Sequence, residues 1–501
     1  MKTMKKICLI TSLFVLFILS ACEEMDEYRE NPNNVSETHP QLLLTKIAND
    51  AFQVEQGSES CVVQYASRMM IISDIALEEQ FYTWTRGDYA NYDKLRNVQK
   101  MMEEAERIES DTYQALAKLF RALYFYDLTL TFGDIPYSQA LKGEMEEVYR
   151  PEYDTQKAVF QGILRELEEA NTLLTNHSDI VEGDIIYGGN AANWRKFINA
   201  FRLKVLLTLS HQVDDSDLNI ESTFADIYAN QPIIESVAEG AQMEFVDALG
   251  SRYTEFNDSR YASAVFLDST FVQRLVDRQD PRLFIYAAQT KNAKEAGKPV
   301  DDFTGYGGGN PIAPPDNVYA TAGEGNISLI NQKRYTQDPV NEPHMVLGYP
   351  EVEFILAEAS VRGWISSDPK THYENGVKAS FEFYNTYAED YAAYVEQADA
   401  ENYLQQDLVN FDNASTDEEK IRLIIMQKYL QSFLQNKWTP YFEHLRTGYP
   451  AFLHQPGQTP PTRWMYPNEA YQQNGEHVEA AIARQFGGEN DGIRQVPWWL
   501  K

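Results

Sequence analysis

Residues 117–137 read AKLFRALYFYDLTLTFGDIPY, a strongly apolar and aromatic run that ends in a glycine and a proline. Gly133 tolerates a positive φ and Pro136 cannot continue a helix, so we expect a helix to end at this turn. Within and just before the run, apolar residues recur every three or four positions, which places them on one face of an α-helix. They are Tyr113, Leu116, Ala117, Phe120, Leu123 and Tyr124.

Two later segments carry further helix signals. Apolar residues repeat at helical spacing from Trp194 through Phe197 and Phe201 to Leu209. The stretch Thr416-Asp417-Glu418-Glu419 has the pattern of a capping box. No run of alternating polar and apolar residues is long enough to form a large sheet. The sequence therefore predicts a mainly α protein with few short strands.

The composition narrows the possible partners. The 501 residues include 43 Lys plus Arg against 75 Asp plus Glu, a formal net charge of −32. Such a polyanion repels phosphate backbones, so nucleic-acid binding is excluded. Aromatic residues make up 13% of the chain, with 31 Tyr, 25 Phe and 7 Trp. This excess needs an explanation, because tyrosine lies at surfaces and interfaces as often as in a core.

The N-terminus has the features of an export signal. Lys2, Lys5 and Lys6 precede the apolar stretch 7–19, which is too short to cross a bilayer about 30 Å thick. The sequence Leu19-Ser20-Ala21-Cys22 resembles a bacterial lipobox, in which the chain is cut before the cysteine and the thiol is lipidated. We therefore expect a signal peptide at residues 1–21 and lipidation of Cys22.

An acidic segment follows the predicted lipid anchor. Residues 23–27 read EEMDE, and Asn31-Pro32-Asn33-Asn34 breaks any regular structure. An acidic run at this position resembles the signal that sends lipoproteins of Bacteroidetes-type bacteria to the outer face of the outer membrane. We expect a tether at residues 22–40 and a single domain at residues 41–501.

The sequence shows no recognisable catalytic or cofactor motif. It has no HExxH, CxxC, P-loop or GxSxG pattern, so we expect no enzymatic activity and no cofactor. A hydrolase with an unrecognised pair of carboxylates stays open as an alternative. The acidic stretch 412–419 lacks the fixed glycine and terminal glutamate of an EF-hand loop, so a structural Ca²⁺ ion stays open as an alternative without support.

Several blocks along the chain, in the expected order, resemble the SusD/RagB family of outer-membrane nutrient-binding lipoproteins. The first is the run 117–137 itself, and with Cys22 the resemblance spans nearly all of the chain that follows the signal. The other blocks are Tyr187–Asn190 with Trp194 and Phe197, Tyr349–Phe354 with Ala357–Ala359 and Gly363-Trp364, Arg446–Pro450, Arg463–Pro467, and Gly487-Gly488 with Val496–Trp499.

The resemblance implies a fold, a partner and a function. The fold would be an α-solenoid of tetratricopeptide-like helix pairs, with irregular excursions and few short strands forming a ligand-binding face. The partner would be a SusC-like TonB-dependent transporter, over which the lipoprotein sits as a lid. The ligand would be a glycan or oligosaccharide, or, in the alternative reading, an oligopeptide as in RagAB-like importers. The protein would face the cell exterior.

Binding of a neutral sugar requires flat aromatic faces beside polar groups, so we sought aromatic residues on irregular segments. The first such segment, residues 80–93, contains Trp84 between two helical stretches. The resemblance favours Trp84 in particular, because a tryptophan on the loop after an early helix commonly contacts the ligand in this family. The other candidates in the segment are Tyr82, Arg86, Tyr89 and Tyr92.

Two further irregular segments contain candidate ligand contacts. The segment 291–347 is rich in glycine and proline and contains Phe303, Tyr306 and Tyr319. Because a long irregular segment in a compact protein is often functional, we place these three rings at the ligand. Tyr253 lies in the polar segment 250–260. By contrast, Trp194 and Trp438 stand among apolar neighbours on predicted helices, and we expect both in the core.

Overall fold

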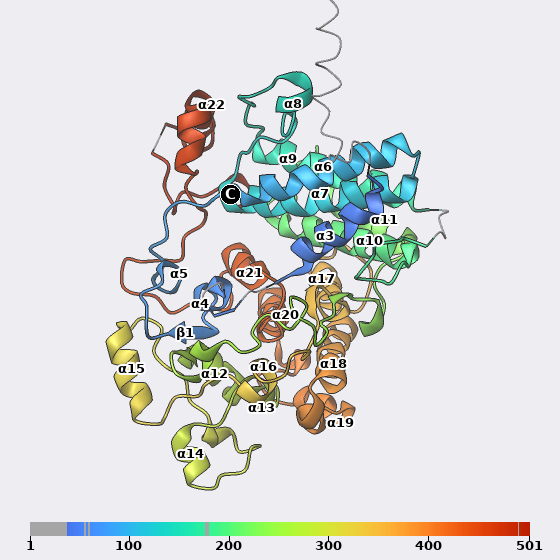
Figure 1. Ribbon diagram of the computed structural model, residues 1–501. Coiled ribbons are helices and arrows are strands. Elements are labelled where there is room, and N and C mark those ends of the chain that lie inside the picture. The colour runs from blue at the N-terminus through green and yellow to red at the C-terminus, as the bar shows by residue number, and fades with distance from the viewer. Residues whose placement is uncertain (1–37, 55–56, 59–60, 176–179, 489) are drawn as a thin grey trace, which may run out of the picture.

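The computed structural model describes residues 38–501 except 55–56, 59–60, 176–179 and 489. Helices dominate this part of the chain, and the strands are few and short, as the sequence predicts (Figure 1). The predicted signal peptide 1–21, the lipidation site Cys22 and nearly all of the tether 22–40 lie outside the described residues. No helix in the described part is both long and apolar enough to cross a membrane.

The N-terminal half forms a layer of helices that lies at the top of Figure 1. Consecutive helices pack side by side, α6 on α7 and α9 on α10, and α7 also packs on α9. This arrangement agrees with the helix pairs expected from the sequence. The helices of the layer are α3 (Pro40–Phe52), α6 (Ala90–Arg107), α7 (Asp111–Phe132), α9 (Gln156–Leu173), α10 (Ala191–Thr208) and α11 (Ile220–Asn230).

Helix α7 contains the run that opens the sequence argument. The Ser110 side chain accepts a hydrogen bond from the Tyr113 amide at its start. The helix ends at Phe132, and Gly133 follows with a φ of 88°. Its stripe Tyr113–Tyr124 is buried, as predicted, but most of its other positions are buried too. A helix buried on nearly all sides must lie at the centre of its layer.

A second group of helices lies below this layer in Figure 1. Helix α17 packs against both α18 and α20. The predicted capping box is confirmed at the start of α20, where the Thr416 hydroxyl accepts from the Glu419 amide and the Glu419 carboxylate accepts from the Thr416 amide. The helices of this group are α17 (Tyr349–Val361), α18 (Pro369–Tyr387), α19 (Gln397–Tyr403), α20 (Asp417–Leu430) and α21 (Thr439–Thr447).

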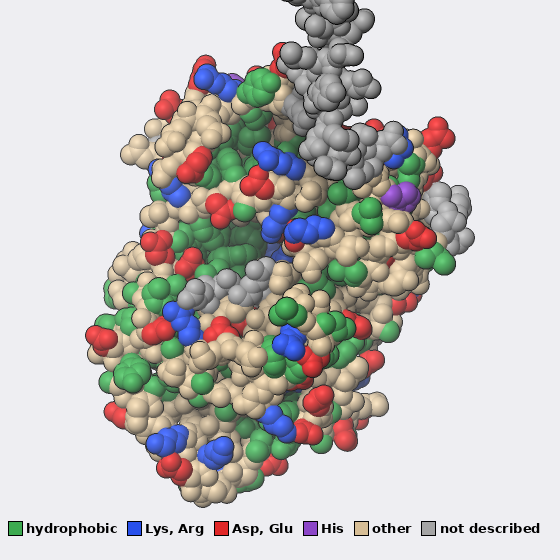
Figure 2. All heavy atoms as spheres, viewed as in Figure 1, with side chains coloured by type: hydrophobic (Ala, Val, Ile, Leu, Met, Phe, Trp, Pro, Cys, Tyr) green, Lys and Arg blue, Asp and Glu red, His purple; other side chains and the backbone are tan. Residues whose placement is uncertain are grey.

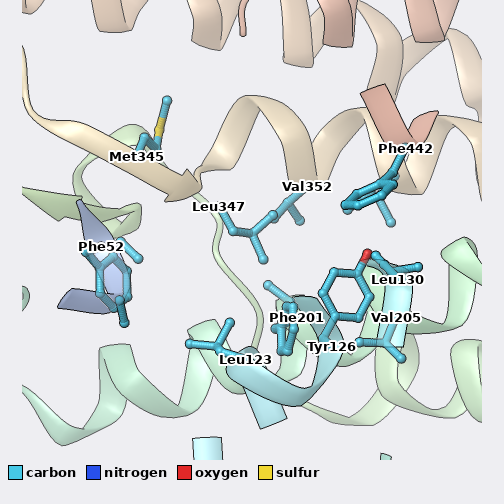
Figure 3. Close-up of a cluster of buried hydrophobic side chains, with 14 of the residues drawn as sticks. Phe52, Leu123, Tyr126, Leu130, Phe201, Val205, Met345, Leu347, Val352 and Phe442 are labelled. Carbon is cyan, nitrogen blue, oxygen red and sulfur yellow. The ribbon is translucent and has the colours of Figure 1, made fainter. Parts of the chain in front are cut away.

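Apolar side chains from both groups meet in one core (Figure 3). Phe52 of α3, Leu123 of α7 and Phe201 of α10 come from the upper layer. Val352 of α17 and Phe442 of α21 come from the lower group. Since this core joins segments far apart in the sequence, the two groups of helices hold each other in place.

Two short antiparallel ribbons are the strand pairs of the described residues. β1 (Met70–Ile72) pairs with β3 (Val265–Leu267), with Met70 opposite Leu267. β2 (Ala241–Met243) pairs with β4 (His344–Leu347), with a register shift between Ala241 and Gln242. Each ribbon ties a segment to a distant part of the chain, and β3 leads directly into the irregular region that follows.

The C-terminal segment 459–501, which includes α22 (Asn468–Phe486), returns to the N-terminal half. The Trp464 amide donates to the Thr131 carbonyl at 2.9 Å, and the Met465 amide donates to the Thr85 carbonyl at 2.8 Å. Trp499 is fully buried, and its amide donates to the Gln156 side chain at 3.1 Å. These contacts fix the end of the chain against α7 and α9.

A buried ion network crosses the lower group of helices. Arg446 of α21 makes two hydrogen bonds to Glu358 of α17, the Nη2–Oε2 distance being 2.6 Å, and it also contacts Glu443. Glu443 in turn accepts from Lys428 of α20 at 2.6 Å. Charges removed from water are tolerated only when they are paired in this way. The cationic partners hold the pKa of Glu358 and that of Glu443 below their usual range.

Candidate ligand-binding site

A cleft of about 970 Å³ opens in the irregular region that follows β3. Its walls come from the residues around α13 and α14, from the segment 300–306, from α15 with residues 325–337, and from Tyr391 of the 3₁₀ helix η5 (Glu389–Tyr394). In Figure 1 these elements form the lower part of the molecule, with α14 and α15 at its lower left. The elements are α12 (Ser269–Asp277), α13 (Leu283–Tyr286), α14 (Lys291–Glu295), η4 (Phe303–Gly305), α15 (Pro315–Gly323) and α16 (Gln332–Tyr335).

The consecutive glycines 307–309 in this region allow the backbone to pack closely against its neighbours. The Gly309 amide donates to the Leu267 carbonyl at 2.9 Å, and the Ser269 amide donates to the Gly309 carbonyl at 2.8 Å. A Cβ atom on Gly308 would lie 2.4 Å from the Ser269 backbone, so only glycine allows this close approach. The predicted binding segment is therefore an ordered strap held against the end of β3.

Three tyrosines line the cleft. Tyr319, on α15, is 66% exposed. The half-buried Tyr306 donates from its hydroxyl to the Val300 carbonyl at 2.7 Å, and Tyr391 donates to the Asn331 side chain at 3.2 Å. Burial raises the pKa of Tyr306 above its ordinary value, so its hydroxyl stays neutral. The cleft thus offers two aromatic rings that are held in place by their own hydroxyl groups, Tyr306 and Tyr391, and one exposed ring, Tyr319.

Phe284 of α13 supports the aromatic wall from inside. Its ring centroid lies 4.6 Å from that of Phe303 and 5.6 Å from that of Tyr306. Phe284 and Tyr306 line the cleft, while Phe303 is packed behind them on the core. Of the three aromatic residues predicted in this segment, the structure therefore places Tyr306 and Tyr319 at the cleft and Phe303 in support.

The polar side chains of the cleft are amides and lysines. The amides are Gln289, Asn331, Gln332 and Gln337, and the lysines are Lys291, Lys294 and Lys333. Asn331 is 4% exposed, and its Nδ2 has no hydrogen-bond partner among the described residues. Amides of this kind can donate to and accept from the hydroxyl groups of a sugar.

No residue of the segment 80–93 lines the cleft, and its central residues are buried against other parts of the protein. Trp84 is 2% exposed and stacks on Trp464, with ring centroids 4.9 Å apart. Tyr82 is fully buried, its hydroxyl donates to the Ala66 carbonyl at 2.7 Å, and the Arg68 guanidinium covers its ring at 4.0 Å. Protein atoms therefore cover both rings, and their role in binding stays a prediction.

The other candidates of that segment also have protein partners. Arg86 contacts the Tyr466 carbonyl and lies 3.6 Å from the Asp491 carboxylate. The Tyr89 hydroxyl lies 2.8 Å from that of Tyr153, and the Tyr92 hydroxyl donates to the Pro136 carbonyl at 2.6 Å. Burial raises the pKa of both Tyr89 and Tyr92. The structure brings these residues together with the C-terminal segment and not with the cleft, and their role in binding stays a prediction.

Tyr253 is likewise a packed residue. It is 2% exposed, and its ring meets those of Phe245 at 5.3 Å and His344 at 5.5 Å. It does not line the cleft. Of the two tryptophans expected in the core, Trp194 is fully buried and Trp438 is half-buried against Trp84 and Trp464.

Sequence reasoning missed the parts of the cleft that come from elsewhere in the chain. Phe284 lies on a four-residue helix, and Tyr391 follows α18, so neither belongs to the glycine-rich segment. Asn331 and the lysines belong to no motif. Only the density of tyrosines between residues 384 and 394 gave a signal near Tyr391.

A second cavity, of about 40 Å³, lies between α7 and α21. Figure 2 shows a depression with an apolar floor between these two helices. Asp127, Lys204 and Lys437 are among the lining residues, and burial raises the pKa of Asp127 while it lowers that of Lys437. The volume suits one or two water molecules and is too small for a sugar ring.

Within the described part of the chain, no three His, Cys, Asp or Glu side chains gather in a way that could hold a metal ion.

Comparison with known proteins defines the family. The family model for SusD-like proteins, described as starch-binding and associating with the outer membrane, matches residues 32–467. The chain belongs to this SusD-like family. No curated protein matches it.

Solved structures from Bacteroides agree with this membership. A SusD homologue from Bacteroides fragilis is 50% identical, with a TM-score of 0.87, and the match covers 93% of this chain and all of that one. An outer-membrane protein of Bacteroides vulgatus, for which a part in nutrient binding is suggested, is 49% identical over the same shares, with a TM-score of 0.88. A chitin-binding protein at 22% identity, with a TM-score of 0.71 over 92% of this chain and 98% of its own, shares the fold.

Proposed function

We propose that the protein binds oligosaccharides on the outer face of the outer membrane and passes them to a SusC-like TonB-dependent transporter. Cys22 would carry the lipid that anchors it, and the protein would perform no catalysis. The observation that carries the proposal is the 970 Å³ cleft with Tyr306, Tyr319 and Tyr391 on its walls, in a chain of the SusD-like family.

The chemistry of the cleft suits a sugar. The C–H face of a sugar ring stacked on an exposed tyrosine such as Tyr319 removes on the order of 100 Å² of apolar surface from water, worth ~2.5 kcal/mol before ordering costs. Amide side chains beside the rings, such as Gln332 and Gln337, provide donors and acceptors for hydroxyl groups. Two or three such contacts give a Kd in the micromolar to millimolar range, roughly −4 to −8 kcal/mol.

Modest affinity is consistent with the proposed role. A lid that hands its ligand to a transporter must also release it, and weak contacts give short residence times. The size of the cleft is in the range of small-ligand sites, which are commonly 300–1,000 Å³. A cleft of about 970 Å³ accommodates several sugar units.

The test is isothermal titration calorimetry of the protein against neutral polysaccharides, acidic polysaccharides and peptide digests. Binding of a polysaccharide, with an affinity that Tyr319→Ala lowers at least tenfold, would support the proposal. Tyr149→Ala is the matched control, because Tyr149 is 75% exposed and does not line the cleft. If only the peptide digests give heat on titration, the ligand is an oligopeptide and not a glycan.

Catalysis has its own test. The protein is incubated with any oligosaccharide that it binds, and new reducing ends are measured. We expect none. New reducing ends that disappear on substitution of one Asp or Glu would contradict the non-enzymatic role and restore the hydrolase alternative.

A further inference from the structure

The charge of the cleft is opposite to that of the whole chain. The sequence has a formal net charge of −32. Among the described residues that line the cleft, however, the charged side chains are Lys291, Lys294 and Lys333, with no Asp or Glu. In a chain with 75 acidic and 43 basic residues, a wall of this size without a carboxylate is a departure from the average surface.

The three lysines differ in how far neighbouring acids neutralise them. Lys333 pairs with Asp390, and Lys291 lies 3.9 Å from Glu295 on the same short helix. Lys294 makes no ion pair with any described residue. All three are exposed, and Figure 2 shows basic side chains at the end of the molecule where α14 lies. No ion pair within the described residues therefore competes with a ligand for Lys294.

A buried donor strengthens the case for an acceptor-rich ligand. Asn331 lines the cleft at 4% exposure, and its Oδ1 already accepts from the Tyr391 hydroxyl. Its Nδ2 has no partner among the described residues. A buried N–H without an acceptor is unfavourable, so this group is suited to a ligand oxygen.

We propose that the cleft selects oligosaccharides that carry anionic groups, either uronate carboxylates or sulfates. Lys294 contacts the anionic group, Lys291 and Lys333 add to the local positive field, and Tyr319 stacks on the sugar ring. The inference rests on the proposed saccharide-binding function and deepens it. A neutral sugar could use the tyrosines, the amides and the lysine N–H donors, but it would not use the positive charge of three lysines.

The expected effect is moderate and sensitive to salt. An ion pair at an exposed lysine contributes little on its own and is screened within about 10 Å at 0.1 M salt. Replacing Lys294 should weaken binding several-fold, and replacing all three lysines should weaken it at least tenfold. An increase from 50 to 300 mM NaCl should reduce the affinity of the unaltered protein, but change that of the triple variant much less.

The experiment uses an array of oligosaccharides in three classes: neutral, uronate-bearing and sulfated, each anionic compound beside its neutral counterpart. Methyl-esterified oligogalacturonate is the counterpart of oligogalacturonate, and desulfated chondroitin that of chondroitin sulfate. The proteins are the unaltered chain, Lys294→Gln, and the triple Gln variant of Lys291, Lys294 and Lys333. Lys46→Gln is the control, because its side chain is 63% exposed like that of Lys333, is also paired with an aspartate, and lies outside the cleft.

Preferential binding of an anionic compound, reduced in the two cleft variants and unchanged in Lys46→Gln, would support the inference. Binding to uronates alone or to sulfates alone would identify the anionic group. Binding to neutral compounds alone would overturn the inference and leave the proposed function intact. Anionic binding that is insensitive to the cleft lysines would overturn it as well. Binding to no saccharide would overturn both the inference and the proposed function.

Discussion

The indole of Trp84 stacks on that of Trp464, with ring centroids 4.9 Å apart and planes 16° from parallel. Trp438 meets Trp464 edge-on at 4.8 Å and 87°. Residues from the beginning and the end of the chain thus build one aromatic cluster, which Tyr441 completes at 5.5 Å from Trp84. Stacked and edge-to-face pairs of this kind add to the free energy that burial alone provides.

We predict that Trp84→Ala destabilises the protein by ~3–5 kcal/mol, the usual cost of removing a large buried aromatic side chain. Urea unfolding followed by circular dichroism would measure it. Trp84→Phe keeps part of the stacking and should cost less. If Trp84→Ala instead left the free energy of unfolding unchanged and abolished sugar binding, Trp84 would be a ligand contact.

The buried ion network predicts an acid-sensitive stability. Arg446 holds the pKa of Glu358 well below that of an unfolded glutamate, about 4.3. The folded state is therefore favoured at pH values above about 4.3, and this contribution is lost as the pH falls below that value. Arg446→Met removes the cation that Glu358 and Glu443 share inside the protein and should cost ~3–5 kcal/mol at pH 7. Melting temperatures between pH 3 and 7 would show both effects.

The matched control for that network is Arg422→Met. Arg422 pairs with Glu418 at the exposed start of α20, and this pair should contribute less than ~1 kcal/mol. Equal losses for the two arginines would contradict the claim that burial makes the Arg446 network important.

Two buried histidines predict a second pH dependence, at milder pH. Desolvation lowers the pKa of His344 to about 3 and that of His444 to about 4. The Nδ1 atom of His344 accepts from the Val54 amide at 3.0 Å, which requires the neutral ring. An unfolded histidine takes up a proton below pH about 6.5, so the stability that is present above that pH decreases as the pH falls.

Each of these histidines should cost roughly 2 kcal/mol of stability at pH 5 relative to pH 7.5. His344→Gln should flatten the pH profile of the unfolding free energy, although it lowers the stability at pH 7.5. A profile that is unchanged by this substitution would show that His344 is protonated equally in the folded and unfolded states.

Two helical glycines predict opposite outcomes for one substitution. A Cβ atom on Gly162 of α9 would lie 2.2 Å from the Tyr137 ring, whereas one on Gly475 of α22 meets no atom within 4 Å. Gly162→Ala should destabilise by ~1–3 kcal/mol through overpacking, and Gly475→Ala should be neutral or slightly stabilising. Thermal unfolding of both variants, at equal protein concentration, would measure the difference.

The proposed lipid anchor predicts a change of location. In a bacterial host that processes lipoproteins, Cys22→Ser should move the protein from the membrane fraction to the soluble fraction. Fractionation followed by immunoblotting would detect this, and Cys61→Ser is the matched control because Cys61 is fully buried. Retention of the Cys22→Ser protein on the membrane would contradict the anchor.

The helices could be predicted from the sequence because their signals are local. The stripe that begins at Tyr113, the end at Gly133 and the cap at Thr416 each depend on residues within a few positions. The residues that line the cleft were harder to predict. Tyr306 and Tyr319 were found from a glycine-rich segment that the fold leaves at the surface, and the structure places both at the cleft.

The burial of Trp84 could not be predicted from its local sequence, for a physical reason. Its neighbours in the sequence are polar, and it has no apolar stripe of its own, so it has the local pattern of an exposed residue. Its cover comes from Trp438 and Trp464, at the other end of the chain. Burial that depends on such distant contacts leaves no periodic signal in one sequence.

The return of residues 459–501 to the N-terminal half also has a consequence for biosynthesis. A ribosome releases the chain from its N-terminus, so α7 and Trp84 emerge long before Trp464 and Trp499 can cover them. Until then the growing chain presents apolar surface that is prone to aggregation. We expect it to depend on chaperones throughout synthesis, and to reach its final stability only when its last segment has docked.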